Sequence, residues 1–385
     1  MYTLRLIFKN SMRHKLRTSL TILGLVVAIF SFGLLQTVVD AWYAGAEGAS
    51  NTTLVTRNKT SLVFPLPLSY QARIRAVPGV SGVGFANWFQ GTYKDPKNFF
   101  AQFAISGDSY LNIYPDYLLP PDDRAAFLKD RKGCIVGRKL ADQYGFKVGD
   151  IIPLKGTIYP GNWELVVRGI YDGKQSTTNT STLFFHWDYV NETMKKVAPR
   201  RSNQIGVYVV QIDQPENAAA ISAAVDKEFA NSLAETLTET EKAFQLGFVS
   251  MSEAIVVAIR VVSFVVIIII AAVMANTMAM SARERLGEYA TLKALGFGPG
   301  FLTLMILGES LLLSAIGAAI GIVILFPFAS FLGKVMGTMF PVFEVSQLTV
   351  IQQVLAALAI GAVAAIAPTI RAVRINIVDG LRSIG

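Results

Sequence analysis

The sequence predicts an α-helical membrane protein with four transmembrane helices and an α+β extracytoplasmic domain inserted between the first and second of them. Of its 385 residues, 52% are hydrophobic and only 16% are charged, which is too apolar for a soluble protein of this length. Four apolar runs reach the roughly 20 residues that a helix needs to cross a bilayer. A more polar stretch, rich in strand signals, separates the first run from the second.

The four predicted spans cover residues 20–39, 261–280, 301–328 and 350–370. Ahead of the first span the chain is basic and has no acidic residue, and this bias predicts a cytoplasmic N-terminus. Four spans then return the C-terminus to the cytoplasm. The basic residues ahead of the first span are Arg5, Lys9, Arg13, Lys15 and Arg17.

The remaining basic residues near the spans follow the same pattern. Segment 281–300 and the tail, both predicted to be cytoplasmic, hold several arginines, whereas the outer loop 329–349 has only Lys334. The net charge of +8 is therefore a topology signal, and we do not expect nucleic acid as a partner.

A second interpretation makes the first span a cleaved signal peptide, because Ala44-Gly45-Ala46 imitates a cleavage site. Its apolar core, however, is longer than the usual range of about 7 to 15 residues. We therefore interpret this segment as a membrane anchor.

This topology divides the chain into three parts. Residues 1–42 hold a cytoplasmic leading helix and the first transmembrane helix, and residues 43–253 form the extracytoplasmic domain. Residues 254–385 hold the end of a stalk, the other three spans, a cytoplasmic coupling helix at 281–297 and a short cytoplasmic tail. Because the middle of the external domain is richer in strand signals than its flanks, we expect a subdomain inserted at about 91–198.

Strands and helices alternate in the predicted external domain. Helices are predicted at 68–77, at 138–144 with Gly145 as the C-cap, and at 217–233 after Pro215. The predicted strands are 82–89, 99–106, 163–170, 181–185 and 205–212.

The segment that leads from the external domain into the second span predicts a long helix. Residues 236–296 contain no proline, and before Gly296 glycine occurs there only at Gly247 and Gly287. One nearly continuous helix could therefore leave the external domain, cross the membrane and end in the cytoplasm. The alternative is a jointed stalk that bends at Gly247.

The sequence offers no set of residues for catalysis or for binding a metal. The nearest approach to a phosphate-binding loop begins at Gly169, and it lacks both the spacing and a hydroxyl after its lysine. His14 and His186 are the only histidines, so a histidine-based triad or a metal cluster cannot be assembled within the chain. We therefore predict that the chain is not an enzyme and holds no metal.

An amphipathic helix is predicted between the second and third spans. Apolar residues recur there at three- and four-residue steps among charged ones, and a run of glycine and proline separates the helix from the next span. Two interpretations stay open, docking onto a protein partner and resting on lipid headgroups. For docking, the predicted anchors are Leu286, Tyr289, Leu292 and Leu295. The predicted rim charges are Arg283, Arg285, Glu288 and Lys293, and Gly296 ends the helix.

Polar and small residues inside the spans predict how these helices pack. Glu309 lies in the third span, where a carboxylate is costly and contacts protein or water. It could bond a neighbouring helix or carry a proton in transport. Gly317 and Gly321 in the third span and Gly361 in the fourth form small-residue faces, which predict close packing within or between protomers.

These segments, in their order along the chain, resemble the permease subunits of type VII ABC transporters, the family that includes MacB, LolC, LolE, the DevC-like permeases and FtsX. One span, a large external domain and three further spans follow in the same order, so the resemblance covers the whole chain. Segment 285–296 is similar to the family's segment after its second span. Glu309 with Gly317 and Gly321 is similar to its third-span pattern.

Three further segments carry the resemblance. Residues 11–21 with Gly24 are similar to the family's N-terminal leading helix, and 77–83 and 136–150 are similar to its external-domain signatures. The tail departs from the pattern, since Ile377 stands where the family usually has proline.

The resemblance implies a set of partners. Such permeases sit in the cell inner membrane as dimers with a second copy or a paralogue, and each half binds a separate cytoplasmic ABC ATPase at the coupling segment. ATP and Mg bind to that ATPase, so no cofactor is expected in this chain. Its closure moves the external domains and drives export or extraction of a cell-envelope substrate. Some branches add a periplasmic adaptor and an outer-membrane protein.

The sequence disfavours two other functions. A membrane-anchored sensor or ligand-binding receptor without ATPase coupling is disfavoured because no output module follows the spans. A membrane-bound enzyme is disfavoured by the missing catalytic residues.

Overall fold

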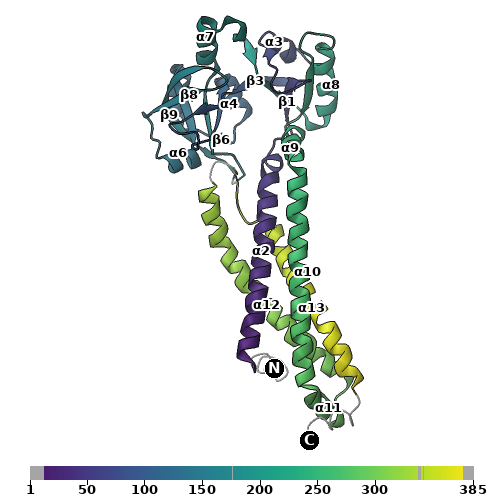
Figure 1. The fold of residues 1–385 in the computed structure, drawn as a ribbon. Helices are drawn as coiled ribbons and strands as arrows, with labels where there is room; N and C mark the ends of the chain where they lie inside the picture. The colour runs from purple at the N-terminus through teal and green to yellow at the C-terminus, as the bar shows by residue number, and fades with distance from the viewer. Residues whose placement is uncertain (1–12, 176, 337–339, 341, 376–385) are drawn as a thin grey trace. The chain divides into compact units, whose positions relative to one another are not determined.

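The computed structural model describes residues 13–175, 177–336, 340 and 342–375 (Figure 1). These residues fall into two compact units. The helical unit comprises 13–40, 253–331 and 343–375, and the inserted domain comprises 41–252 with 332–342, apart from the gaps just given. The first part of the predicted leading helix, residues 1–12, and the tail from 376, with Ile377, lie outside the described residues.

Four helices are long and apolar enough to cross a membrane, which confirms the four predicted spans. Each contains its predicted span and continues past it. They are α2 (Lys15–Glu47), α10 (Glu253–Glu284), α12 (Pro299–Val335) and α13 (Gln347–Arg374). The short helix α11 (Leu286–Ala294) lies between α10 and α12 in the chain.

The predicted continuous helix over 236–296 is wrong at its start and is interrupted twice. Residues Thr236–Thr240 form strand β13, because their alternating threonines pair with a neighbouring strand and bond the side chain of Asp226. Helix α9 (Glu241–Met251) follows, with the Thr240 side chain capping it. The chain breaks at Ser252 and again at Arg285, whereas Gly247 lies inside α9. Neither the continuous helix nor the bend at Gly247 describes this segment.

The inserted domain is built on an 11-stranded mixed sheet in the order β13-β1-β12-β3-β5-β10-β7-β9-β8-β4, with β6 paired to β9. Its strands are β1 (Thr53–Asn58), β3 (Val80–Trp88), β4 (Gly91–Thr92), β5 (Ala101–Ile105), β6 (Tyr117–Leu118), β7 (Gly133–Gly137), β8 (Ile151–Gly156), β9 (Gly161–Gly173), β10 (Thr182–His186), β12 (Val207–Ile212) and β13 (Thr236–Thr240). A separate pair joins β2 (Leu66–Pro67) to β11 (Gln204–Ile205).

Short helices lie in the connections between strands. They are α3 (Tyr70–Arg75), α4 (Asp108–Ile113), α5 (Pro121–Lys129), α6 (Arg138–Tyr144), α7 (Trp187–Val197) and α8 (Ala218–Glu228). Helix α6 has the predicted bounds and ends at Gly145, whose φ of +71° is left-handed, as a C-cap glycine requires. All five predicted strands are present, while β1, β2, β4, β6, β7, β8 and β13 were not foreseen.

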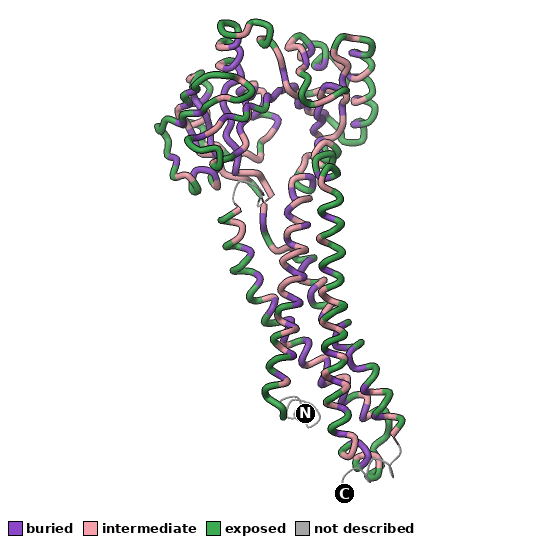
Figure 2. Tube along the Cα trace, in the orientation of Figure 1, coloured by how far each residue is buried: buried purple, intermediate pink, exposed green. Residues whose placement is uncertain are grey.

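Both faces of the sheet are covered by apolar side chains. One cluster includes Leu54, Phe89, Trp163 and Tyr208, and a second, with Phe127 and Tyr171 among others, packs α4 and α5 against the sheet. Strand β10, paired with β5 on one side and with β7 on the other, is buried along its whole length. Its Leu183 and Phe185 belong to the first cluster, and Phe184 belongs to the second. Figure 2 shows the buried residues gathered inside this domain, while exposed residues continue along the long helices.

The segment expected as a subdomain shares this one sheet with its flanks. Residues 91–186 supply β4 to β10, and the flanking chain supplies β1, β3, β12 and β13. The two groups join where β3 pairs with β5.

Candidate functional site

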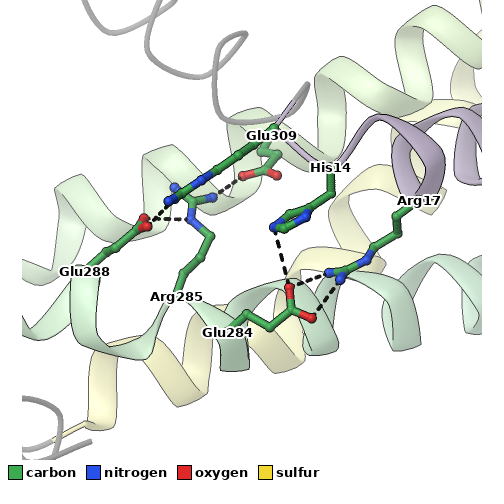
Figure 3. A network of polar contacts seen from close by, with 7 residues as sticks. His14, Arg17, Glu284, Arg285, Glu288 and Glu309 are labelled. Carbon is green, nitrogen blue, oxygen red and sulfur yellow. Dashed lines mark hydrogen bonds and ion pairs between the residues drawn. The ribbon is translucent and has the colours of Figure 1, made fainter. Parts of the chain in front are cut away.

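Arg285 occupies the break between α10 and α11 and holds the segment to its neighbours (Figure 3). Its Nη1 donates to Oε2 of Glu309 at 2.9 Å, and its Nε donates to Oε2 of Glu288 at 3.0 Å. The guanidinium also lies over the Tyr289 ring, 5.5 Å from the centroid. The side chain is only 8% exposed. Arg285, predicted as a rim charge, is therefore a buried tie between the connection and α12.

Glu309 forms a buried ion pair with this arginine. Its side chain is 10% exposed, and carboxylates so placed inside a span need a partner. Of the two roles considered from the sequence, a bond to a neighbouring segment is the one that the geometry shows. A cavity of about 20 Å³ beside Glu309, lined also by His14 and Ser281, has room for a water molecule.

The apolar face of α11 packs against the permease itself. Tyr289 is 2% exposed, and burial raises the pKa of its hydroxyl to about 12. Leu286 and Leu292 are partly buried against the apolar cluster of the helical unit. In this structure these three predicted anchors hold α11 in place and present little surface to a partner.

Lys293 caps another helix. Its ammonium donates to the carbonyls of Val373 and Ile375, at 2.6 and 2.9 Å, at the end of α13. A cation there satisfies carbonyls that have no partner within the helix and complements the helix dipole. Lys293, predicted as a rim charge, thus fixes α11 to α13.

An exposed tip follows α11. Leu295 is 71% exposed and Phe297 is 43% exposed, and they flank Gly296, whose φ of +89° allows the tight turn. Arg283 and Glu288 are also exposed.

The carboxyl of Glu288 has a lowered pKa. Burial alone would raise this pKa, but hydrogen bonds from Arg13 and Arg285 outweigh burial and lower the pKa below its ordinary value.

The predicted glycines lie at close helix contacts within one chain. A Cβ on Gly317 would stand 2.5 Å from the Cβ of Leu25, and one on Gly321 would stand 3.1 Å from the Val26 carbonyl oxygen, both in α2. A Cβ on Gly361 of α13 would meet Ser314 Oγ of α12 at 2.6 Å. The packing that the sequence left open, within or between protomers, is intramolecular at these positions.

Further polar contacts in the helical unit were not foreseen. Asp40, near the end of the first span, accepts hydrogen bonds from the hydroxyls of Ser346 and Thr349 in the first turn of α13, each at 2.7 Å. Gln353 donates to the carbonyl of Ile29 at 2.8 Å, and its own Oε1 has no partner among the described residues. A polar residue inside a span is a signal of such contacts, but its partner lies hundreds of positions away and the sequence does not name it.

No metal centre is formed by the part of the chain that the structure describes, since its His, Cys, Asp and Glu side chains make no group of three or more that could hold an ion. Cys134 is buried in β7 as a free thiol.

Comparison with known families assigns the chain. A model of the MacB-like periplasmic core domain matches residues 18–228, more than half of the chain, and a model of the FtsX-like permease C-terminal region matches residues 260–377. The chain belongs to the type VII ABC transporter permeases. This confirms the resemblance seen in the sequence, and membership of a permease family indicates a transport subunit. The α10–α11–α12 connection and Glu309 fall within the FtsX-like match.

Individual relatives agree with this assignment. An uncharacterized ABC transporter permease of Methanocaldococcus jannaschii is 23% identical over 346 residues, which cover 82% of this chain and 81% of the relative.

Among solved structures, the extracellular domain of the noncanonic ABC-type transporter YknZ from Gram-positive bacteria aligns at 13% identity and a TM-score of 0.36, covering 49% of this chain and all of that domain. The periplasmic region of MacB from Actinobacillus actinomycetemcomitans aligns at 10% identity and a TM-score of 0.37, covering 52% of this type VII permease and 94% of that region.

Proposed function

We propose that this permease couples ATP hydrolysis by a separate cytoplasmic ATPase to movement of its inserted domain. ATP and Mg bind to the ATPase, and the permease itself needs no cofactor. Two permease copies, or one copy and a paralogue, form the working dimer. The movement exports or extracts a cell-envelope substrate, with a periplasmic adaptor and an outer-membrane protein where the substrate must leave the envelope.

The proposed orientation places both termini of this inner-membrane protein in the cytoplasm and the inserted domain outside. Charge supports it: Arg13, Lys15 and Arg17 stand at the start of α2, and Arg371 and Arg374 stand in the last turn of α13. The connection through α11 is then cytoplasmic, where an ATPase can reach it.

The observation that carries the coupling proposal is the exposed tip at Leu295 and Phe297 on a segment whose other side is anchored. Exposed large apolar residues at a tight turn suit a groove on a partner. Arg285 and Lys293 tie the same segment to α12 and α13, so a displacement of the tip displaces the helices. The partner anchors proposed from the structure are therefore Leu295 and Phe297, in place of the buried Tyr289.

A crosslinking experiment tests the docking site. A photoreactive benzophenone amino acid replaces Phe297 in the full chain, and irradiation crosslinks it to any protein bound at that position. In a parallel sample, labelled azido-ATP marks the ATP-binding proteins of the same membranes. We expect the protein crosslinked to position 297 to be one of those that azido-ATP marks. The same benzophenone at Val265, on the exposed face of α10, is the matched control and should not capture that chain.

A pair of variants separates docking from folding. Leu295→Ala with Phe297→Ala should release the ATP-labelled chain while the permease keeps its melting temperature. Tyr289→Ala should lower the melting temperature, because it opens a cavity inside the permease. If the double variant still holds the ATP-labelled chain with wild-type affinity, the tip is not the docking site.

A further inference from the structure

Helix α2 is continuous over its whole length. It runs without interruption from Lys15 to Glu47, a length of about 50 Å, and its residues up to Asp40 belong to the helical unit while those from Ala41 belong to the inserted domain. The other connection to residues 41–252 passes from α9 to α10 through the break at Ser252, which is also where the units divide. Helix α2 is therefore unbroken where the chain first passes from one unit to the other, as α12 is at Phe331, whereas a break at Ser252 separates α9 from α10.

The start of α2 is attached to the end of α10 by a paired set of charges. Arg17 donates from both terminal nitrogens to the two carboxylate oxygens of Glu284, at 2.6 and 2.8 Å, in the bidentate geometry that favours this pairing (Figure 3). His14 lies 3.8 Å from the same carboxylate. This contact joins residues 267 positions apart in the chain.

A second pair attaches α2 to α11. Arg13 donates to Oε1 of Glu288, and the other oxygen of that carboxylate accepts the Nε–H of Arg285. Arg285 is in turn bonded to Glu309. The start of α2 is thereby connected through one carboxylate to the buried tie that fixes α11.

We propose that Arg13 and Arg17 are positioning residues that carry displacement of the α11 segment to the start of α2. The proposal rests on the coupling function above, and it assigns transmission to α2 in addition to the interrupted path through α10. We call the four residues Arg13, Arg17, Glu284 and Glu288 the clamp.

The exposure of the clamp suits a movable attachment. Its side chains are between 29% and 58% exposed, in contrast to the buried pair of Arg285 and Glu309. Exposed pairs contribute little to stability, so they can shift as the segment moves without unfolding the protein. The bidentate pair of Arg17 and Glu284 still defines one preferred register between α2 and α10.

Charge reversal and exchange test the clamp. The full permease, reconstituted in lipid nanodiscs with its ATPase, carries Arg17→Glu, Glu284→Arg or both, and ATPase stimulation and the amount of bound ATPase are measured. We expect each single variant to lower stimulation about two- to fivefold, the range that a close exposed pair supports. Bound ATPase should stay at the wild-type level. The double variant restores opposite charges, so stimulation should return toward wild type.

A matched control and the melting temperature exclude a merely structural effect. Arg138 and Asp172 form a bidentate pair of similar exposure within the inserted domain, and Arg138→Glu should leave stimulation unchanged. The clamp proposal would be refuted if both single variants kept wild-type stimulation. It would also be refuted if the double variant stayed low in stimulation at an unchanged melting temperature. If the wild-type permease bound no ATPase, the coupling function on which the clamp rests would be refuted instead.

Discussion

Helices α2 and α10 are both apolar enough to span a membrane, yet they are used differently. Of the most apolar window of each helix, 39% is buried in α2 and 11% in α10. Helix α2 contains Gly24 and Gly33 and meets the glycines of α12, whereas α10 has no glycine and touches the bundle through a narrow strip that includes Met274 and Met278. Hydrophobicity determines which helices can span the membrane. Small residues determine which helices pack together, because in lipid no hydrophobic effect drives helices to associate.

The two helices also differ in continuity. Helix α2 continues into the inserted domain, while α10 stops at Ser252 at one end and at Arg285 at the other. The broad exposed face of α10, with Phe264 and Ile268 each more than 60% exposed, is left for lipid or for a second copy. An interrupted helix with few buried residues depends on specific ties at its ends.

The largest expected effect comes from removing one such tie. Arg285→Met leaves the Glu309 carboxylate buried without its partner, which commonly costs about 3–5 kcal/mol. Unfolding of the detergent-solubilised permease by denaturant measures the loss. Arg285→Met combined with Glu309→Met replaces the pair by apolar side chains and should recover most of it. A double variant as unstable as the single one would show that the ion pair does not hold the end of α10.

Proline substitution tests the difference in continuity. Val38→Pro removes a main-chain hydrogen bond inside α2 and should cost about 3 kcal/mol or more. Glu253→Pro stands at the first residue of α10, where proline is tolerated, and should cost less than about 1 kcal/mol. The midpoints of chemical unfolding give both values. Equal losses would mean that the break at Ser252 is not a joint.

Substituting leucine for a glycine tests the packing of α12 against α2. Gly317→Leu places side-chain atoms where Leu25 already lies, and such overpacking typically costs about 1–3 kcal/mol. Gly300→Leu introduces the same side chain in the first turn of the same helix, where nothing lies within 4 Å. We expect only the first variant to lower the melting temperature, and equal tolerance would contradict the intramolecular contact.

A smaller, pH-dependent effect is expected where α9 begins. Glu241 accepts hydrogen bonds from the Tyr114 hydroxyl at 3.0 Å and from the Ser50 amide at 3.3 Å. Burial raises the pKa of this carboxyl, and the hydrogen bonds from Tyr114 and Ser50 only partly offset it. A pKa raised on folding stabilises the protein below the unfolded value, and that contribution is lost as pH rises through the folded pKa.

Glu241→Gln removes this titration while keeping the shape of the side chain. Relative to wild type, the variant should gain in melting temperature as the pH rises above about 4, the ordinary pKa of a glutamate. Glu253→Gln, at an exposed carboxyl, is the control and should show no such trend. A difference between Glu241→Gln and wild type that stays constant as the pH rises would rule out the buried titration.

The sequence alone determined which segments enter the membrane and which type of domain lies between them. A span is recognised from the apolar content of about 20 consecutive residues, so the signal is local. Helix α6 with its Gly145 cap was foreseen for the same reason, since capping needs only neighbouring residues. Strand β13 was missed because Thr236–Thr240 is decided by its pairing with β1 and by Asp226, both outside any local window.

Only the tertiary structure decided what the charges and glycines of the helical unit contact. Arg285, Tyr289 and Lys293 have the helical spacing of a docking face, and that spacing is the same whether the face meets a partner or the chain's own helices. The choice depends on which helices lie beside α11, which is set by close approaches such as that of Gly317 to α2. Contacts between residues far apart in the chain follow from the packing of whole helices, and no local pattern contains that information.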